Sequence, residues 1–180
     1  MPNEVNVQTM YTGPTGNPDT FNEPSLYAGG SLGQRLEKND LSYQLVKADS
    51  GATASTATGV IAATQLAFWK DPDAYIVTNN APQALGGQVT NAYRNFVAGV
   101  FRTAVTAGYY CYILQRGSGV DIKMTSGGGI GQLMTANSGT AADAVAVAVG
   151  TQLTYLGLGR LRGASANNVV NVDLDVPSAP

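Results

Sequence analysis

The stretch that decides the fold class is GYYCYILQRGSGVDIKM, residues 108–124. Its first part, Tyr109–Gln115, holds seven residues with a strong preference for β-strands. Its last part, Val120–Met124, alternates apolar and polar residues with the period of two that is typical of a half-buried strand. Between them lies Arg116-Gly117, where a glycine predicts a turn that ends the first strand. The stretch therefore predicts two short β-strands in succession.

The same signals recur on both sides of this stretch. Near the end of the chain, Val170–Val176 places valines and leucine on one face and Asn171, Asp173 and Asp175 on the other. Upstream, Gln34–Lys47 is predicted to form a hairpin with its turn at Lys38-Asn39-Asp40, and Ala74–Thr78 a short strand. Short strands separated by glycine turns predict a mainly β protein, a small β-barrel or β-sandwich with short helical or irregular insertions and an extended N-terminal arm.

In three stretches the sequence is compatible with two different structures. Gln88–Arg102 has apolar residues at roughly helical spacing, but its end, Val97–Phe101, fits a strand equally well. In Ala141–Val149 the alanines favour helix, whereas the alternating valines favour strand. Gly51–Thr58 contains only Gly, Ala, Ser and Thr, which suits a loop or an edge of small residues.

The first thirty residues differ from the rest of the chain, because four of the eight prolines lie among them. Proline removes backbone donors and blocks helices, so this segment is predicted to be extended. It also carries spaced apolar and aromatic residues, which a flexible linker would lack. We therefore expect an arm, residues 1–30, that lies along its own domain or a neighbouring subunit, and a β-rich domain, residues 31–180. The candidate contact residues of the arm are Tyr11, Phe21, Leu26 and Tyr27.

The composition argues against several classes of function. Only 12% of the residues are charged, against about 25% in an average domain, and the formal net charge is −2. The chain has no histidine, so the commonest general base and metal ligand is missing, and its single cysteine excludes an internal disulfide. The ten basic residues are scattered, which gives no footprint for nucleic acid or an anionic membrane. We expect a protein that is not an enzyme and that takes no cofactor and no metal.

The N-terminus, Met1–Glu4, has no basic or apolar region typical of a secretory signal. The most apolar stretches, Gly59–Phe68 and Ala141–Val149, are shorter than the roughly 20 residues that span a bilayer. We therefore expect a soluble protein that is made without export.

Two glycine-rich stretches are predicted to be structural rather than functional loops. Gly29–Gly33 fits the G-x-S-x-G nucleophile elbow, but that chemistry needs a histidine and a strand before the serine. Gly127–Gly131 lacks the spacing of a P-loop or a dinucleotide-binding turn, so it is predicted to be a loop between strands.

The carboxylate pairs and the cysteine also have structural explanations. Asp71-Pro72-Asp73 is typical of a turn, and Asp173 and Asp175 fit a solvated outer face, although a calcium site built on such carboxylates is an alternative. Cys111 is predicted to be a core thiol. Of Tyr109, Tyr110 and Tyr112, at least one is expected to face away from the core, where it would suit a protein contact.

The chain from about residue 31 to 176 resembles the head decoration, or cementing, proteins of tailed bacteriophages. Their recurring pattern is a Gly-Tyr strand that ends in a Gln-x-Gly turn, an alternating strand, a Gly-acid-x-Leu turn and a last alternating strand. Here Gly108-Tyr109, Gln115–Gly117, Val120–Lys123 and Gly131–Leu133 occupy the successive positions, with Gln132 in place of the usual acid. Residues 32–48, LGQRLEKNDLSYQLVKA, are similar to the opening strand pair of that family.

The resemblance implies a small structural virion protein, often trimeric, that is made in the host cytoplasm. Such a protein binds the outer surface of the expanded capsid and stabilises contacts between major capsid subunits. Low charge and an aromatic arm agree with repeated protein contacts. Another virion component of the neck or tail, a carbohydrate-binding β domain and a hydrolase that uses only carboxylates are the alternatives.

Overall fold

The structure, a computed structural model, describes residues 30–50, 52, 60–80, 97–125, 128–136, 143–147, 157–163 and 168–176. About 60% of these residues lie in strands and none in a helix, which confirms the mainly β class. The strands are β1 (Arg35–Lys38), β2 (Leu41–Ala48), β3 (Val60–Ile61), β4 (Leu66–Asp71), β5 (Ile76–Thr78), β6 (Val97–Phe101), β7 (Val105–Thr106), β8 (Tyr110–Lys123), β9 (Leu133–Ala136), β10 (Ala144–Ala146), β11 (Gly159–Leu161) and β12 (Val169–Asp175).

The first half of the fold is a closed five-stranded β-barrel. Its strands follow one another in the order β2, β5, β4, β6 and β8, and the pairing of β8 with β2 closes the ring. Four of the five pairings are antiparallel, and the contact between β2 and β5 is parallel. Because the barrel is closed, each of its five strands has a neighbouring strand on both sides.

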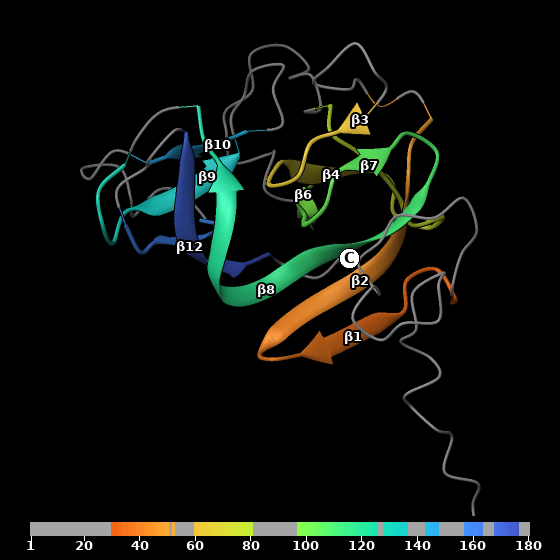
Figure 1. Cartoon of the computed structure of the whole chain (residues 1–180), viewed down its shortest axis with the longest axis horizontal. Helices are drawn as coiled ribbons and strands as arrows, with labels where there is room; N and C mark the ends of the chain where they lie inside the picture. Colours follow the sequence, from red (N-terminus) through yellow and green to blue (C-terminus); the bar gives the residue numbers. More distant parts are fainter. Residues whose placement is uncertain are drawn as a thin grey trace, which may run out of the picture.

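Strand β8 corrects the predicted turn at Arg116-Gly117, because it continues without a break for 14 residues (Figure 1). The glycines produce a β-bulge instead of a turn: Val120 pairs with Val172 and Gly117 with Leu174, so Ser118 and Gly119 together face Asp173. Gly119 has φ +72°, a conformation that side chains rarely adopt, so the extra residue falls where glycine is required. The bulge bends β8 and lets one strand serve both halves of the fold.

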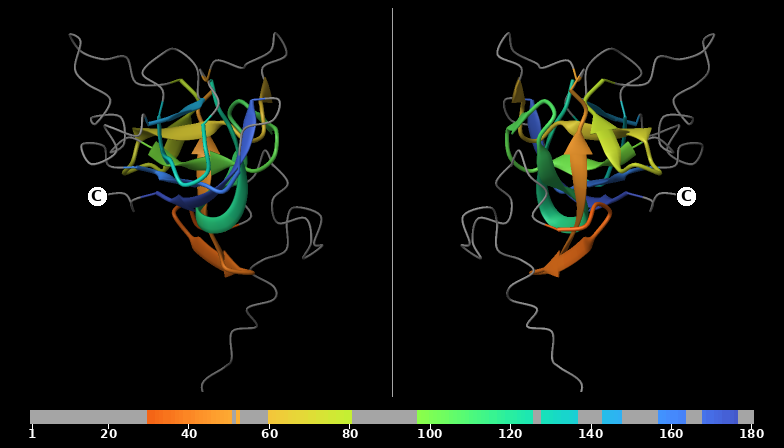
Figure 2. Two further views of the ribbon diagram at one scale, coloured as in Figure 1. Left: turned by 90° about the vertical axis from the view of Figure 1, so that its left-hand side faces the viewer. Right: turned by 90° about the vertical axis from the view of Figure 1, so that its right-hand side faces the viewer.

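The second half of the fold is built on the far end of β8. From there the sheet continues through β12, β11, β9 and β10, with every pairing antiparallel. A parallel bridge between Met124 and Ala144 brings β10 back beside the end of β8. The β1–β2 hairpin projects at one end of the molecule (Figure 2). Within the part of the chain that the structure describes, β3 pairs with β7 alone.

The hairpin predicted over Gln34–Lys47 is confirmed by β1 and β2. Its turn residues Asn39 and Asp40 have φ of 52° and 61°, the left-handed conformation that a two-residue hairpin turn requires. The last strand, predicted over Val170–Val176, is β12. In the strand predicted over Ala74–Thr78 the first two residues belong to a turn, because Tyr75 has φ of 53° and β5 begins only at Ile76.

In the undecided stretches, most of the described residues lie in strands. Val97–Phe101 forms β6, and Ala144–Ala146 forms β10. The remainder of Gln88–Arg102 before Val97, and most of Gly51–Thr58, lie outside the described residues.

Two clusters of buried side chains form the core. The larger joins the hairpin, the barrel and the second sheet, and includes Leu36, Leu45, Leu114, Met134 and Val172. The smaller takes residues from all five barrel strands and from β3 and β7, and includes Val46, Ala67, Val77, Ala98 and Cys111. Because β8 contributes to both clusters, the bent strand is the structural link between them.

Candidate functional site

The four arm residues predicted to make protein contacts, Tyr11, Phe21, Leu26 and Tyr27, lie outside the described residues. Within the described residues, the most developed polar surface is the outer face of the β8–β12 ladder beyond the bulge. Here the period-two alternation buries Val120, Ile122, Val172 and Leu174 and turns their neighbours outward. The outward residues include Ser118, Asp121, Asp173 and Asp175, joined by Arg162 just after β11.

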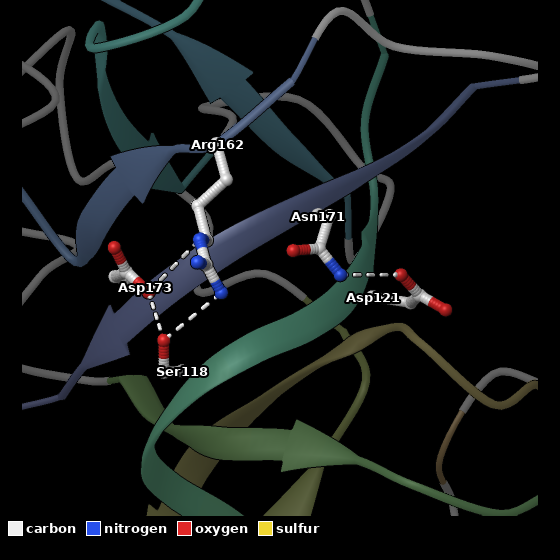
Figure 3. A network of polar contacts seen from close by, with 5 residues as sticks. All are labelled: Ser118, Asp121, Arg162, Asn171 and Asp173. Carbon is white, nitrogen blue, oxygen red and sulfur yellow. Dashed lines mark hydrogen bonds and ion pairs between the residues drawn. The ribbon is translucent and has the colours of Figure 1, made fainter.

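Three of these side chains form a connected network at the bulge (Figure 3). The hydroxyl of Ser118 donates to Asp173 Oδ1 at 2.6 Å and accepts from Arg162 Nη1 at 3.1 Å. Arg162 Nε lies 3.6 Å from the same Asp173 oxygen. The bulge points Ser118 toward Asp173. The residue that interrupts the β8–β12 ladder therefore also links the two strands through its side chain.

A second contact on the same face joins Asn171 and Asp121. The amide Nδ2 of Asn171 donates to Asp121 Oδ1 at 3.2 Å, between residues that pair directly across β12 and β8 (Figure 3). Together the two contacts tie β8, β12 and the segment after β11 along one surface.

The network fixes the positions of these surface side chains but contributes little to the free energy of unfolding. The side chains of Arg162 and Asp173 are 52% and 55% exposed. Exposed ion pairs contribute about 0–1 kcal/mol, because water competes for both charges. The described side chains here form a defined pattern of hydrogen-bonding groups on the surface.

A surface depression of about 380 Å³ lies beside this network. It forms where β8 passes from the barrel to the second sheet, since Arg116 pairs with Ser42 of β2 and with Asp175 of β12. Its walls therefore mix three carboxylates with one arginine and a few apolar atoms. The lining residues are Asp40, Arg116, Gly117, Ser118, Asp173, Leu174 and Asp175.

The outer-face interpretation of Asp173 and Asp175 is confirmed, since both are exposed, and Asn171 is half-buried. The sequence does not predict that Ser118 and Asp121 share one surface, because the turn predicted at Arg116-Gly117 places them on separate elements. Asp71 also behaves as predicted: its Oδ1 accepts the Ala74 N–H at 3.1 Å and fixes the turn. Among the described residues no group of three or more acids and thiols is arranged to hold a metal ion.

The two glycine motifs lead into strands. After Gly33 the chain enters β1, and the described residues Gly128–Gln132 form a loop that leads into β9. Neither position opens a helix, which is the arrangement that a nucleophile elbow or a phosphate-binding loop requires.

Cys111 is confirmed as a core thiol. It is 2% exposed, and burial raises its pKa from 9.0 to about 12, because an apolar environment disfavours the thiolate. The neighbouring tyrosines are all at least partly covered: Tyr112 is buried, and Tyr109 and Tyr110 are half-buried. Lys47 Nζ lies 5.4 Å from the ring centre of Tyr110. Tyr112 is therefore a core residue, whereas Tyr109 and Tyr110 are each partly exposed; their use in a protein contact stays a prediction.

The part of the chain that the structure describes contains no helix long and apolar enough to cross a membrane.

A scan against known protein families finds no match, and a search of curated proteins finds none either. Among solved structures, the chain is similar to the N-terminal base of the head fibre protein gp8.5 of bacteriophage phi29. The two sequences are 12% identical, the match covers 78% of this chain and 98% of that chain, and the TM-score is 0.47. Identity and superposition at this level do not transfer a function from that protein to this chain.

Proposed function

We propose that this chain is a structural protein of a phage virion, which binds the outer surface of the expanded capsid and stabilises contacts between major capsid subunits. The observation that carries the proposal is the resemblance of residues 31–176 to phage head decoration proteins. Its recurring positions lie on successive parts of the fold, with one departure. Gly108-Tyr109 leads into β8, and Gly131–Leu133 leads into β9. At Gln115–Gly117, where the pattern has a turn, β8 bends and continues through Val120–Lys123.

The replacement of the usual acid by Gln132 is compatible with this assignment. The side-chain Oε1 of Gln132 accepts the N–H of Gly129 at 2.6 Å. A carboxylate oxygen caps a turn in the same way, so the glutamine retains the structural task of an acid in this turn.

The composition supports a role in binding rather than catalysis. A chain without histidine, with one buried thiol and with 12% charged residues is suited to large uncharged protein contacts. On this proposal the protein acts without a cofactor, forms a homotrimer on the capsid exterior, and uses its N-terminal arm to reach a capsid subunit or a sister protomer. The similar solved structure is by its name part of a phage head fibre, but its low TM-score keeps that likeness from serving as support.

The test is to mix the purified full-length protein with empty, undecorated expanded capsids and to measure co-sedimentation, followed by imaging. Regular added density at the local threefold positions is expected. A truncated protein that begins at residue 31 should keep the β circular dichroism spectrum of the full chain and lose capsid binding.

Three outcomes would contradict parts of the proposal. Folded full-length protein that never sediments with capsids would exclude capsid decoration, and rings on isolated necks or tails would favour the other virion assignment. Specific glycan binding would favour the carbohydrate-binding alternative. Unchanged binding of the truncated protein would exclude the arm as the contact.

A further inference from the structure

Strand β1 (Arg35–Lys38) lies at one end of the ten-stranded sheet, and among the described residues it pairs with β2 alone. In an antiparallel ladder every second residue exchanges backbone hydrogen bonds with the neighbouring strand. Here the Leu45 N–H donates to Gln34 O at 2.9 Å, so the bonded positions of β1 are the even-numbered ones. The backbone N–H and C=O groups of Arg35 and Glu37 therefore point away from β2, along the outer edge of the projecting hairpin (Figure 2).

The two residues with outward backbone groups also carry opposite charges on one face of the strand. Arg35 and Glu37 are exposed, whereas Leu36 between them is 3% exposed and belongs to the core. Across the hairpin, Arg35 pairs with Gln44 and Glu37 with Ser42, so each charge faces an uncharged residue. None of the ion pairs within the described part of the chain includes either residue. The edge thus presents one cation and one anion that a neighbouring strand can pair.

Charged residues on an edge strand usually prevent strand addition, because a second strand brings like charges together. For β1 the outcome depends on the register. When two copies of β1 pair antiparallel about a twofold axis at Leu36, Arg35 of each copy faces Glu37 of the other. These are the residues with outward backbone groups, so each facing pair also exchanges two backbone hydrogen bonds. The two other registers that pair these groups set Arg35 against Arg35 or Glu37 against Glu37. One register therefore satisfies both the backbone groups and the charges.

We propose that the outer edge of β1 is a contact between two copies of this chain, which pair antiparallel about Leu36 and join their sheets. The contact is independent of the proposed function, because it rests on the β1 edge and its charges alone. A twofold contact cannot build a threefold ring. In the proposed homotrimer it would therefore connect copies that belong to neighbouring trimers. Because the paired segment is short, the association should be weak and should form at high protein concentration.

The test is sedimentation equilibrium of the full-length protein over a concentration series up to about 1 mM. The wild type is expected to associate by a doubling of its mass. Arg35→Glu and Glu37→Arg each turn two attractive pairs into two repulsive ones, and each should weaken the association by about tenfold or more. An equimolar mixture of these two variants should associate within about threefold of the wild type, because every charge of one variant then faces an opposite charge of the other.

The matched control is Asp73→Arg, which changes the net charge by the same amount as Glu37→Arg. Asp73 is exposed in the turn between β4 and β5, away from the β1 edge, so this variant should associate as the wild type does.

Thermal unfolding checks that every variant is folded, and both β1 variants should keep the wild-type melting temperature because the two side chains are exposed. A mixture that associates no more strongly than either variant alone would overturn the inference, since the antiparallel register is what restores the pairs. A wild-type mass that stays constant over the whole series would overturn it as well. Capsid binding is measured separately, with undecorated capsids, so failure of the proposed function is distinguishable from failure of this contact.

Discussion

The amide Nε2 of Gln115 lies 2.6 Å from Gln44 Oε1, although 71 residues separate the two in the sequence. Gln115 also donates to the carbonyl of Ala98 at 3.3 Å, and both glutamine side chains are buried. One polar side chain therefore connects β8, β2 and β6, three strands of the closed barrel. A buried hydrogen bond of this kind contributes modestly when made and costs more when one partner is left alone.

Gln115→Leu should destabilise the protein by about 1–3 kcal/mol, because it leaves Gln44 Oε1 and Ala98 O without this donor. The measurement is the free energy of unfolding from urea titration. The double variant Gln44→Leu/Gln115→Leu removes acceptor and donor together, and with them the bond from Gln44 Nε2 to Gly33 O. Its loss should therefore be smaller than the sum of the two single losses. A double variant that loses the sum of both single losses would contradict this explanation.

Gly159→Ala should destabilise the protein by about 1–3 kcal/mol, because a Cβ there would collide with the backbone carbonyl of Asp173 in the paired strand β12. The backbone cannot move aside as a flexible side chain would. Gly163→Ala is the matched control, since a Cβ at that position would have nothing within 4 Å. Equal melting temperatures for the two variants would show that the close approach is not the reason for glycine at 159.

Lys123→Gln should lower the free energy of unfolding by about 1–3 kcal/mol, because it removes the ion-pair partner of a buried carboxylate. Lys123 Nζ lies 3.4 Å from Asp143 Oδ1, and the Asp143 side chain is only 9% exposed. Arg162→Gln is the control, since its partner Asp173 is 55% exposed and the expected loss is about 0–1 kcal/mol. A larger loss for Arg162→Gln than for Lys123→Gln would refute the distinction by burial.

Cys111 should resist thiol reagents in the folded protein at pH 8. Its pKa is raised to about 12 by burial, so the reactive thiolate is scarce, and the sulfur is covered as well. Labelling with a chromogenic disulfide should be slow in buffer and should reach one thiol per chain in denaturant, since the chain has a single cysteine. Complete labelling of the native protein within seconds would place the thiol at the surface.

The same thiol should make stability fall at high pH. Its folded pKa of about 12 exceeds the unfolded value of 9.0, so its contribution is fully present below pH 9 and is lost as the pH rises toward 12. Other groups titrate in this range, so the comparison is with Cys111→Ala. Between pH 9 and 11 the free energy of unfolding should decline less steeply for the variant than for the wild type. Parallel declines would exclude the thiol as the cause.

The sequence predicts an element correctly where the residues of that element alone determine its structure. The Asn39-Asp40 turn has the residue types that accept positive φ, and β12 has a clear alternation, so both are predicted at nearly their observed positions. The composition around Cys111 likewise predicts its buried state.

The remaining features depend on contacts that no local pattern encodes. Glycines at 117 and 119 are typical of a turn, and only the facing strand β12 makes them a bulge within β8. The parallel pairing of β2 with β5, which the barrel needs, joins segments about thirty residues apart, and two aligned residue pairs define it. Ser118 and Arg162 meet because β12 lies between their segments, so the network of the candidate site could not be read from either segment alone. The division into an arm, residues 1–30, and a β-rich domain stays a prediction.

The bend in β8 also determines how a force would pass through the protein. One uninterrupted backbone runs from the barrel, where it pairs with β2 and β6, to the second sheet, where it pairs with β12. A load applied at the projecting β1–β2 hairpin would therefore pass through the β2–β8 ladder into one covalent backbone that reaches the second sheet. The two halves of the fold are therefore held together by a continuous backbone as well as by side-chain packing.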